Sequence, residues 1–327
     1  MGKFRWKGLF FVVVILFVLG GCSKETEKVV KNMKPHRVAA AVEINNRVIE
    51  KEKMQLMIDV VNPLTKEIIR TFNLKELEVE DAVFQTELKN WARELARGTE
   101  DSEGFDQRMV LDKIDENGQI QKGKPMVILQ EEELVKRVLE ASERGGQVEL
   151  PLQVTESQYS PDEVSQLDEV VISSYTTYFD SGVVGRAKNI ELSAAAINNV
   201  IFGPGDIFSY NEIVGPRDEA SGYQKAMEIV NKELVEGIGG GVCQTSSTLF
   251  NAVDAIGVEY IEWHHHSISI GYVPVGRDAT VSYGGLNFRF QNPHDVPFLI
   301  KAFVEGGSLT VEVRTSEEYA KKLNGEL

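Results

Sequence analysis

A single cysteine stands beyond residue 22, and a run of glycines leads into it. The segment GIGGGVCQTSSTLFNA, residues 237–252, places Cys243 where a stretch with helical spacing of apolar side chains begins. Backbone N–H groups at a helix start point outward and stabilise a thiolate, which lowers the thiol pKa. Glycine N–H groups can also bind a developing oxyanion. The pattern predicts a cysteine nucleophile, and the alternative is a buried, inert thiol.

A cysteine nucleophile needs a base, and the chain offers three consecutive histidines: His264, His265 and His266. If this segment is a strand, the outer two share a face and the middle one points away. Asp278 comes next and is expected to orient one imidazole. We predict that Cys243 attacks an amide carbonyl and that His266 acts as general base and then general acid. Gln244 or loop N–H groups would stabilise the oxyanion. Papain-like and transglutaminase-like enzymes use the same chain order.

The histidines also permit a different chemistry. Two histidines one residue apart on a strand, here His264 and His266, form a recurring zinc arrangement. A third ligand would then come from His294 or Cys243. The histidines can also be solvated or structural groups without chemistry. For the favoured hypothesis we expect neither a metal nor a cofactor.

The elements that must position these residues predict an α+β protein of two domains. The first is expected over residues 38–158, with helices at 87–98 and 131–146 and strands at 123–130 and 147–154. The second, over residues 165–315, contains a strand at 170–179 and helices at 189–201 and 244–257.

In the second domain, Thr245, Ser246 and Ser247 sit where helix N-cap residues belong. The strands after residue 257 are joined by short turns, which cannot make parallel crossovers. We therefore expect the Cys243 helix to pack on an antiparallel sheet. Residues 316–327 are expected to be a polar tail.

The N-terminus predicts export. Residues 1–21 combine three positive charges with a short apolar run and end in LGG before Cys22, a pattern typical of a lipoprotein signal peptide. Cys22 would be lipidated, residues 22–37 would form a tether, and the body would lie outside the cytoplasmic membrane. The alternative is a plain signal anchor. With Cys22 lipidated, Cys243 has no intrachain disulfide partner. The formal net charge of −15 argues against a nucleic-acid partner.

The second half resembles the VanW family between about residues 170 and 314. The resemblance is carried by GPGDIFSYNEIVGPR, GYQKA, GGGVCQTSSTLFNA, HHHS, YVPVGRDATV and LNFRFQN. The upstream half, with EEELVKRVLEA and VELPL, is similar to the peptidoglycan-binding domain found before VanW domains. The family takes its name from accessory genes of glycopeptide-resistance clusters. The resemblance implies a cell-envelope setting with peptidoglycan as partner, and it does not supply a reaction.

The family's motif residues transfer by position. Its Cys-Gln, Ser-Thr, His-Ser and Asp-Ala-Thr motifs fall on Cys243 and Gln244, Ser247 and Thr248, His266 and Ser267, and residues 278–280. The candidate binding residues are Gly240, Gly241, Ser247, Thr248, His264, Ser267 and Tyr272. The family's arginine before the His-Ser pair is replaced by Trp263, so its role is not carried over.

Two functions compete. The first is an envelope enzyme that hydrolyses or transpeptidates amides of peptidoglycan stem peptides through Cys243, His266 and Asp278. The second is a non-catalytic peptidoglycan-binding module, in which Cys243 is structural. Its stacking candidates are Tyr210, Tyr223, Trp263 and Tyr272.

Overall fold

The computed structural model describes residues 57–74, 82–230 and 233–324. The predicted signal peptide (1–21), Cys22, the tether (22–37) and the first residues of the predicted upstream domain lie outside this range. The described residues divide into two compact units, one made of those up to 90 and at 132–150, and one made of those at 91–131 and from 151 on. Both combine helices with sheets, which confirms the predicted α+β class.

The first unit contains a small three-stranded sheet in the order β2-β1-β6. Its strands are β1 (Met57–Val61), β2 (Ile68–Asn73) and β6 (Gly146–Glu149). The first two form an antiparallel hairpin, and β6 runs parallel to β1. Helix α5 (Glu131–Ala141) buries one apolar face, as its sequence pattern predicts. Helix α4 (Ala82–Arg97) belongs partly to each unit and ends at Gly98, whose φ is 82°.

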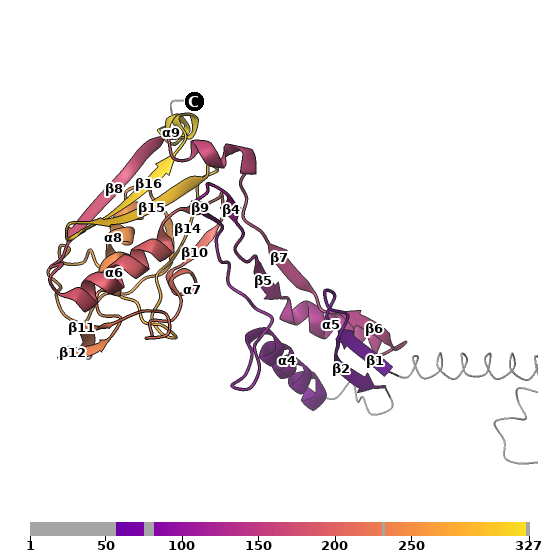
Figure 1. The fold of residues 1–327 in the computed structure, drawn as a ribbon. Helices are drawn as coiled ribbons and strands as arrows, with labels where there is room; N and C mark the ends of the chain where they lie inside the picture. Colours follow the sequence, from indigo (N-terminus) through magenta and orange to yellow (C-terminus); the bar gives the residue numbers. More distant parts are fainter. Residues whose placement is uncertain (1–56, 75–81, 231–232, 325–327) are drawn as a thin grey trace, which may run out of the picture. The chain divides into compact units, whose positions relative to one another are not determined.

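The main layer of the second unit is a six-stranded antiparallel sheet in the order β4-β3-β9-β15-β16-β8 (Figure 1). The strands are β3 (Lys113–Ile114), β4 (Ile120–Gln121), β8 (Val170–Tyr178), β9 (Val200–Phe202), β15 (Phe298–Glu305) and β16 (Ser308–Thr315). Alternate side chains of β16 are buried, because one face of the sheet packs against the core.

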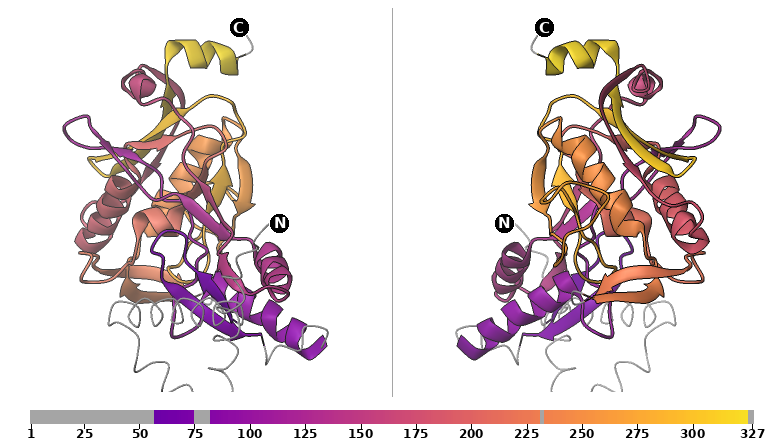
Figure 2. Two further views of the ribbon diagram at one scale, coloured as in Figure 1. Left: turned by 90° about the vertical axis from the view of Figure 1, so that its right-hand side faces the viewer. Right: turned by 90° about the vertical axis from the view of Figure 1, so that its left-hand side faces the viewer.

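Two helices pack against this sheet and against each other (Figures 1 and 2). Helix α6 (Val184–Ile197) contacts β15, and helix α8 (Val242–Asp254) contacts β8 and β16. A smaller antiparallel sheet has the order β10-β14-β13. Its strands are β10 (Ile207–Ser209), β13 (Glu259–Glu262) and β14 (Arg289–Gln291). The core between the layers includes stacked phenylalanine rings. The ring centroid of Phe202 lies 4.7 Å from that of Phe298 and 5.3 Å from that of Phe290.

Shorter elements complete the second unit. Strands β5 (Met126–Leu129) and β7 (Leu152–Thr155) form an antiparallel pair, and β11 (Lys225–Val230) and β12 (Glu233–Ile238) form a hairpin. The remaining elements are η1 (Pro161–Gln166), α7 (Tyr210–Val214) and α9 (Glu317–Leu323). Figure 2 shows that α9 and the β11-β12 hairpin lie at opposite ends of this unit.

Several elements differ from the predictions. Residues 263–288 lack regular strands, although their alternating pattern predicted them, because side chains of α8 take up the backbone groups of this segment. The predicted polar tail contains α9, which begins where the Ser316 hydroxyl accepts the Tyr319 N–H. Residues 91–131 group with the second unit, since β3 pairs with β9. Among the helices described, none has the length and apolar character needed to cross a membrane.

Candidate active site

Cys243 is the second residue of α8 and lies in its first turn. The N-cap is Gly241, with φ of 113°, and Gly239 also takes a positive φ of 102°, a conformation that favours glycine. A Cβ on Gly240 would lie 2.6 Å from the carbonyl oxygen of Met227 on β11. The three glycines therefore allow the hairpin and the helix start to approach closely. The thiol is the only free cysteine of the described chain.

The thiol interacts with three groups. The sulfur lies 3.4 Å from the Val281 carbonyl oxygen and 3.7 Å from the Thr280 hydroxyl. The imidazole of His266 also acts on the thiol, and its effect favours the thiolate. Burial alone would raise the pKa of the Cys243 thiol, but the interaction with His266 and the positive charge of its ring outweigh burial and bring this pKa below its ordinary value of 9.0. The residue as a whole remains partly exposed.

The imidazole of His266 faces a carboxylate on its other side. Nδ1 of His266 lies 2.7 Å from an oxygen of Asp278, and the backbone N–H of His266 donates to the same oxygen over 2.6 Å. Because Nδ1 faces this carboxylate, Nε2 is the atom left for the thiol. Burial would lower the pKa of His266, but its contacts with Cys243 and Asp278 raise it above 6.5. Burial would raise the pKa of Asp278, and the N–H donors of both histidine neighbours lower it instead.

Buried hydroxyls of α8 hold the segment that carries Asp278. The Ser246 hydroxyl donates to the Ala279 carbonyl oxygen over 2.6 Å, and the Ser247 hydroxyl accepts the Ala279 N–H over 3.0 Å. The indole N–H of Trp263 donates to the carbonyl oxygen of Asp278 over 2.9 Å. The helix that carries the thiol therefore also fixes the backbone beside the carboxylate. The predicted N-cap role of these serines is wrong, because they lie inside α8.

Comparison with known proteins identifies this part of the chain. The family described as VanW like protein matches residues 185–314. These residues form a VanW domain. The uncharacterized protein YoaR of Bacillus subtilis (strain 168) is 48% identical over 152 residues, which cover 46% of this chain and 50% of YoaR.

The second relative is the vancomycin B-type resistance protein VanW of Enterococcus faecalis (strain ATCC 700802 / V583). It is 28% identical over 120 residues, which cover 35% of this chain and 44% of that protein. The chain thus spans about half the length of the curated relatives it matches. No solved structure matches it significantly. The family resemblance of the second half is confirmed, and the upstream resemblance stays a prediction.

The other two histidines of the run 264–266 are placed differently from what the strand pattern predicts. His265 places its Nδ1 2.9 Å from the second oxygen of Asp278, and its ring packs on Trp263 with centroids 4.5 Å apart. His264 instead lies 3.2 Å from a carboxylate oxygen of Glu262. The pairing of His264 with His266 on one face is wrong, because β13 ends at Glu262. Among the described residues, no group of three or more His, Cys, Asp or Glu is arranged to hold a metal ion.

Gln244 is fully occupied inside the domain. Its side-chain oxygen accepts from Arg186 over 2.7 Å, and its amide nitrogen donates to the Thr177 hydroxyl and the Tyr178 carbonyl oxygen, each over 3.0 Å. Both amide hydrogens are therefore used, which argues against the predicted oxyanion role of this side chain. The backbone N–H of Cys243 makes no hydrogen bond within the described chain, so it is a better oxyanion donor.

The remaining candidate binding residues divide by exposure. Ser247 and Thr248 are fully buried, and Thr248 pairs with the Thr177 hydroxyl over 2.8 Å, so their contacts are structural. Tyr272 borders the thiol: its phenol interacts with Ser247, and burial raises its pKa above the ordinary value. Ser267 is exposed next to His266.

Two arginines near the start of α8 were not predicted. Arg186 on α6 holds Gln244, and its guanidinium lies 5.9 Å from the ring centroid of Tyr272. Arg217 lies against the glycine turn, where a Cβ on Gly239 would be 3.0 Å from the Arg217 Cβ. Arg217 ends the motif GPGDIFSYNEIVGPR, and this position could have marked it as a candidate site residue. Arg186 lies in no motif, and only the folded chain brings it to the site.

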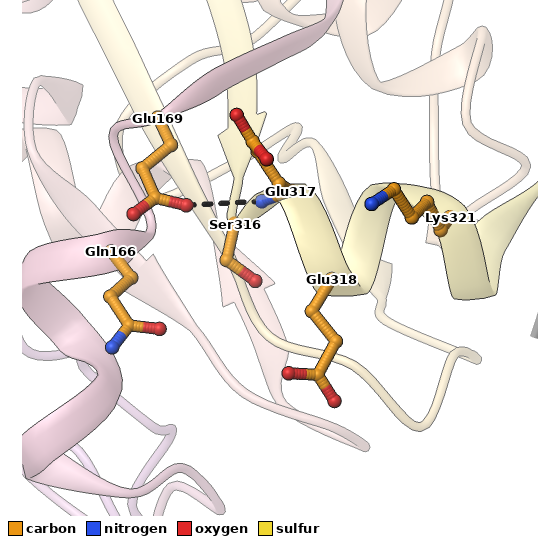
Figure 3. Close-up of a pocket in the computed structure, with 6 residues that line it drawn as sticks. All are labelled: Gln166, Glu169, Ser316, Glu317, Glu318 and Lys321. Atoms are coloured by element: carbon orange, nitrogen blue, oxygen red, sulfur yellow. Dashed lines mark hydrogen bonds between the residues drawn. The ribbon is translucent and has the colours of Figure 1, made fainter.

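Surface hollows occur elsewhere in the second unit. One lies beside η1 and α9, where Glu169 accepts the backbone N–H of Glu317 over 3.1 Å (Figure 3). Its lining residues are Gln166, Glu169, Ser316, Glu317, Glu318 and Lys321. A second hollow is lined mainly by polar residues between 97 and 124. Neither is lined by Cys243, His266 or Asp278, so neither hollow is part of the candidate active site.

Proposed function

We propose that the chain is a cell-envelope lipoprotein whose VanW domain acts on an amide bond of peptidoglycan stem peptides. The observation that carries the proposal is the pairing of the Cys243 thiol with His266, whose other nitrogen faces Asp278. A thiol with a lowered pKa, a base in contact with it and a carboxylate that orients the base are the parts of a cysteine nucleophile.

The proposed reaction has two stages. The Cys243 thiolate attacks the amide carbonyl carbon, and the oxygen takes the negative charge beside the free Cys243 N–H. Protonated His266 gives its proton to the leaving amine, and the C–N bond breaks to leave a thioester on the sulfur. Water then attacks the thioester with His266 as base, the C–S bond breaks, and the carboxylic acid leaves with the thiolate of Cys243 regenerated, which gives hydrolysis. An amine in place of water gives transpeptidation.

The envelope setting rests on the sequence. Residues 1–21 have the charge and hydropathy pattern of a lipoprotein signal peptide, and Cys22 follows small residues. We propose that lipid on Cys22 anchors the chain outside the cytoplasmic membrane, with peptidoglycan as the partner. The name of the enterococcal relative links that protein to vancomycin B-type resistance. A wall-directed activity of this chain is compatible with that link and is a proposal.

The deciding experiment is the pH dependence of alkylation of Cys243 by iodoacetamide in the purified full-length chain. Alkylation is read by peptide mass spectrometry, because Cys22 is the only other cysteine. We expect a midpoint below the ordinary thiol value of 9.0, and a shift of this midpoint back toward that value in His266→Ala. A thiol that reacts only in denaturant would refute the proposal.

Catalysis is then tested directly. Wild type and Cys243→Ala are incubated with purified peptidoglycan and with synthetic stem peptides, and the products are identified by mass spectrometry. Cleavage or exchange in the wild type alone is expected. An inert thiol in a chain that still co-sediments with isolated cell walls would favour the non-catalytic binding module instead.

A further inference from the structure

Arg217 carries a positive charge that the described chain leaves unpaired. Both of its terminal nitrogens, Nη1 and Nη2, are buried and have no hydrogen-bond partner. No acidic side chain of the described residues lies within ion-pair distance of it, although the chain has a net charge of −15. A buried cation without a counter-ion is costly, so a position of this kind requires a compensating group.

The surroundings of the guanidinium are aromatic. Its central carbon lies 5.6 Å from the ring centroid of Tyr210 and 5.7 Å from that of Tyr283. Both distances are within the range of cation–π attraction, which stabilises the charge in part. Such rings supply no acceptor oxygen in the plane of the guanidinium, where its N–H groups point. The aromatic pair therefore positions the cation and leaves its donors available.

The two tyrosines that flank Arg217 connect to the segments around the thiol. The Tyr210 hydroxyl donates to the carbonyl oxygen of Val242, the residue before Cys243, over 3.2 Å. Tyr283 follows Val281 by two residues, and the Val281 carbonyl oxygen is the one in contact with the sulfur. The guanidinium is thus bracketed by the two chain segments that form the walls around the nucleophile.

We infer that Arg217 binds a free carboxylate of the substrate, next to the amide carbonyl that Cys243 attacks. A guanidinium binds a carboxylate by donating two parallel N–H···O hydrogen bonds. The pair of bonds fixes the orientation of the carboxylate as well as adding affinity. The substrate class is therefore a peptide with a carboxylate near the scissile amide. Stem peptides that end in a free carboxyl group meet this description. The inference rests on the proposed function and narrows its substrate.

Tyr283 is the group that must move to admit the carboxylate. The side chain of Tyr210 is fully buried, and its hydroxyl is hydrogen-bonded. Tyr283 is 57% exposed, and its hydroxyl makes no hydrogen bond within the described chain. Its ring can therefore turn toward solvent at low cost and uncover the guanidinium.

The test measures protection of Cys243 from iodoacetamide by two peptides in the full-length chain. One is diacetyl-L-lysyl-D-alanyl-D-alanine with a free C-terminal carboxylate, and the other is its C-terminal carboxamide. We expect the carboxylate to protect at a concentration at least about tenfold lower, because hydrogen bonds to ionised groups are the stronger ones. Arg217→Gln removes this difference, Arg217→Lys retains part of it, and Arg144→Gln, the same change at an exposed arginine, leaves it intact.

The outcomes separate the two proposals. Equal protection by the two peptides in the wild type, or none by either, overturns the carboxylate subsite without any variant being needed. A difference that persists in folded Arg217→Gln overturns it as well. Failure of the proposed function is read from the iodoacetamide rate without peptide. An unreactive thiol removes the proposed function, whereas a reactive thiol with no carboxylate preference removes only the role of Arg217.

Discussion

Replacement of Asp278 by asparagine tests whether the carboxylate acts on the thiol through His266. One oxygen of Asp278 accepts both the backbone N–H and Nδ1 of His266, and the other accepts from His265. Asparagine has nearly the same shape but loses the charge, and its NH2 group cannot accept. The imidazolium is then less favoured, so the pKa of His266 falls and that of Cys243 rises toward its ordinary value.

The size of the effect follows from the hydrogen bond between the Asp278 carboxylate and the His266 imidazolium, whose acceptor loses its charge in the substitution. A hydrogen bond to an ionised group contributes about 1.5–3 kcal/mol, and about 1.4 kcal/mol corresponds to a factor of ten in an equilibrium. The thiolate population of Asp278→Asn at about pH 7 should therefore fall about ten- to a hundredfold, and the alkylation rate with it. The backbone around Asp278 should stay in place, since the Trp263 indole donates to the Asp278 carbonyl oxygen and the Ser247 hydroxyl accepts the Ala279 N–H.

The assay is the rate of iodoacetamide alkylation of Cys243 against pH, with the thermal midpoint measured in parallel. Asp254→Asn is the matched control. Asp254 is a carboxylate at the other end of α8 that accepts from Tyr260 over 2.6 Å and Arg277 over 2.7 Å, with no contact to His266. If Asp278→Asn and Asp254→Asn show the same rate and the same midpoint, Asp278 does not act on the thiol, and the reasoning fails.

Three further predictions concern the turn before the thiol, a buried carboxylate in the fold, and the N-terminus. Gly240→Ala should lower the thermal midpoint and slow alkylation of Cys243, because the new Cβ would meet the Met227 carbonyl oxygen at 2.6 Å. The control is Gly271→Ala, whose Cβ would have no heavy atom within 4 Å, and it should change neither quantity. Asp112→Asn should destabilise the fold by about 1–3 kcal/mol at neutral pH, because donors including Lys122 outweigh burial and lower the Asp112 pKa. That stability is present above pH 3.8 and lost as the pH falls through the folded-state pKa, so denaturant titrations of the two proteins should converge in acid. Cys22→Ser should abolish lipid at the mature N-terminus and release the chain from membranes, as read by mass spectrometry and fractionation; continued lipidation would contradict the predicted lipobox.

The sequence predicted the residues of the candidate site better than their surroundings. Cys243, His266 and Asp278 were selected from residue type and chain order, and the fold brings these three together. The helix that carries the thiol was recognised because its apolar spacing is regular. The choice of these three residues rested on their order along the chain. It therefore did not depend on whether His266 lies on a strand.

The segment after β13 could not be predicted from its pattern. Alternation of apolar and polar residues is a signal for strands only when a neighbouring strand takes up the backbone groups. Here side chains of α8 take up several of them, and the segment stays irregular. Alternation therefore gave the wrong facing for His264 and His265, which contact Glu262 and Asp278.

The spacing along α8 explains how one helix sets the whole arrangement. Ser246, Ser247 and Asn251 follow Cys243 by three, four and eight residues, so all four lie on one helical face. The serines hold Ala279, and Asn251 donates to the Arg277 carbonyl oxygen over 2.8 Å. These contacts fix the peptide units on both sides of Asp278. A polar helical face in the centre of a core is costly unless every group on it is satisfied, and here each of these side chains is hydrogen-bonded to one segment. The hydroxyls that follow the cysteine in the sequence therefore set the position of the carboxylate relative to the thiol, and a cysteine elsewhere on the helix would not meet His266.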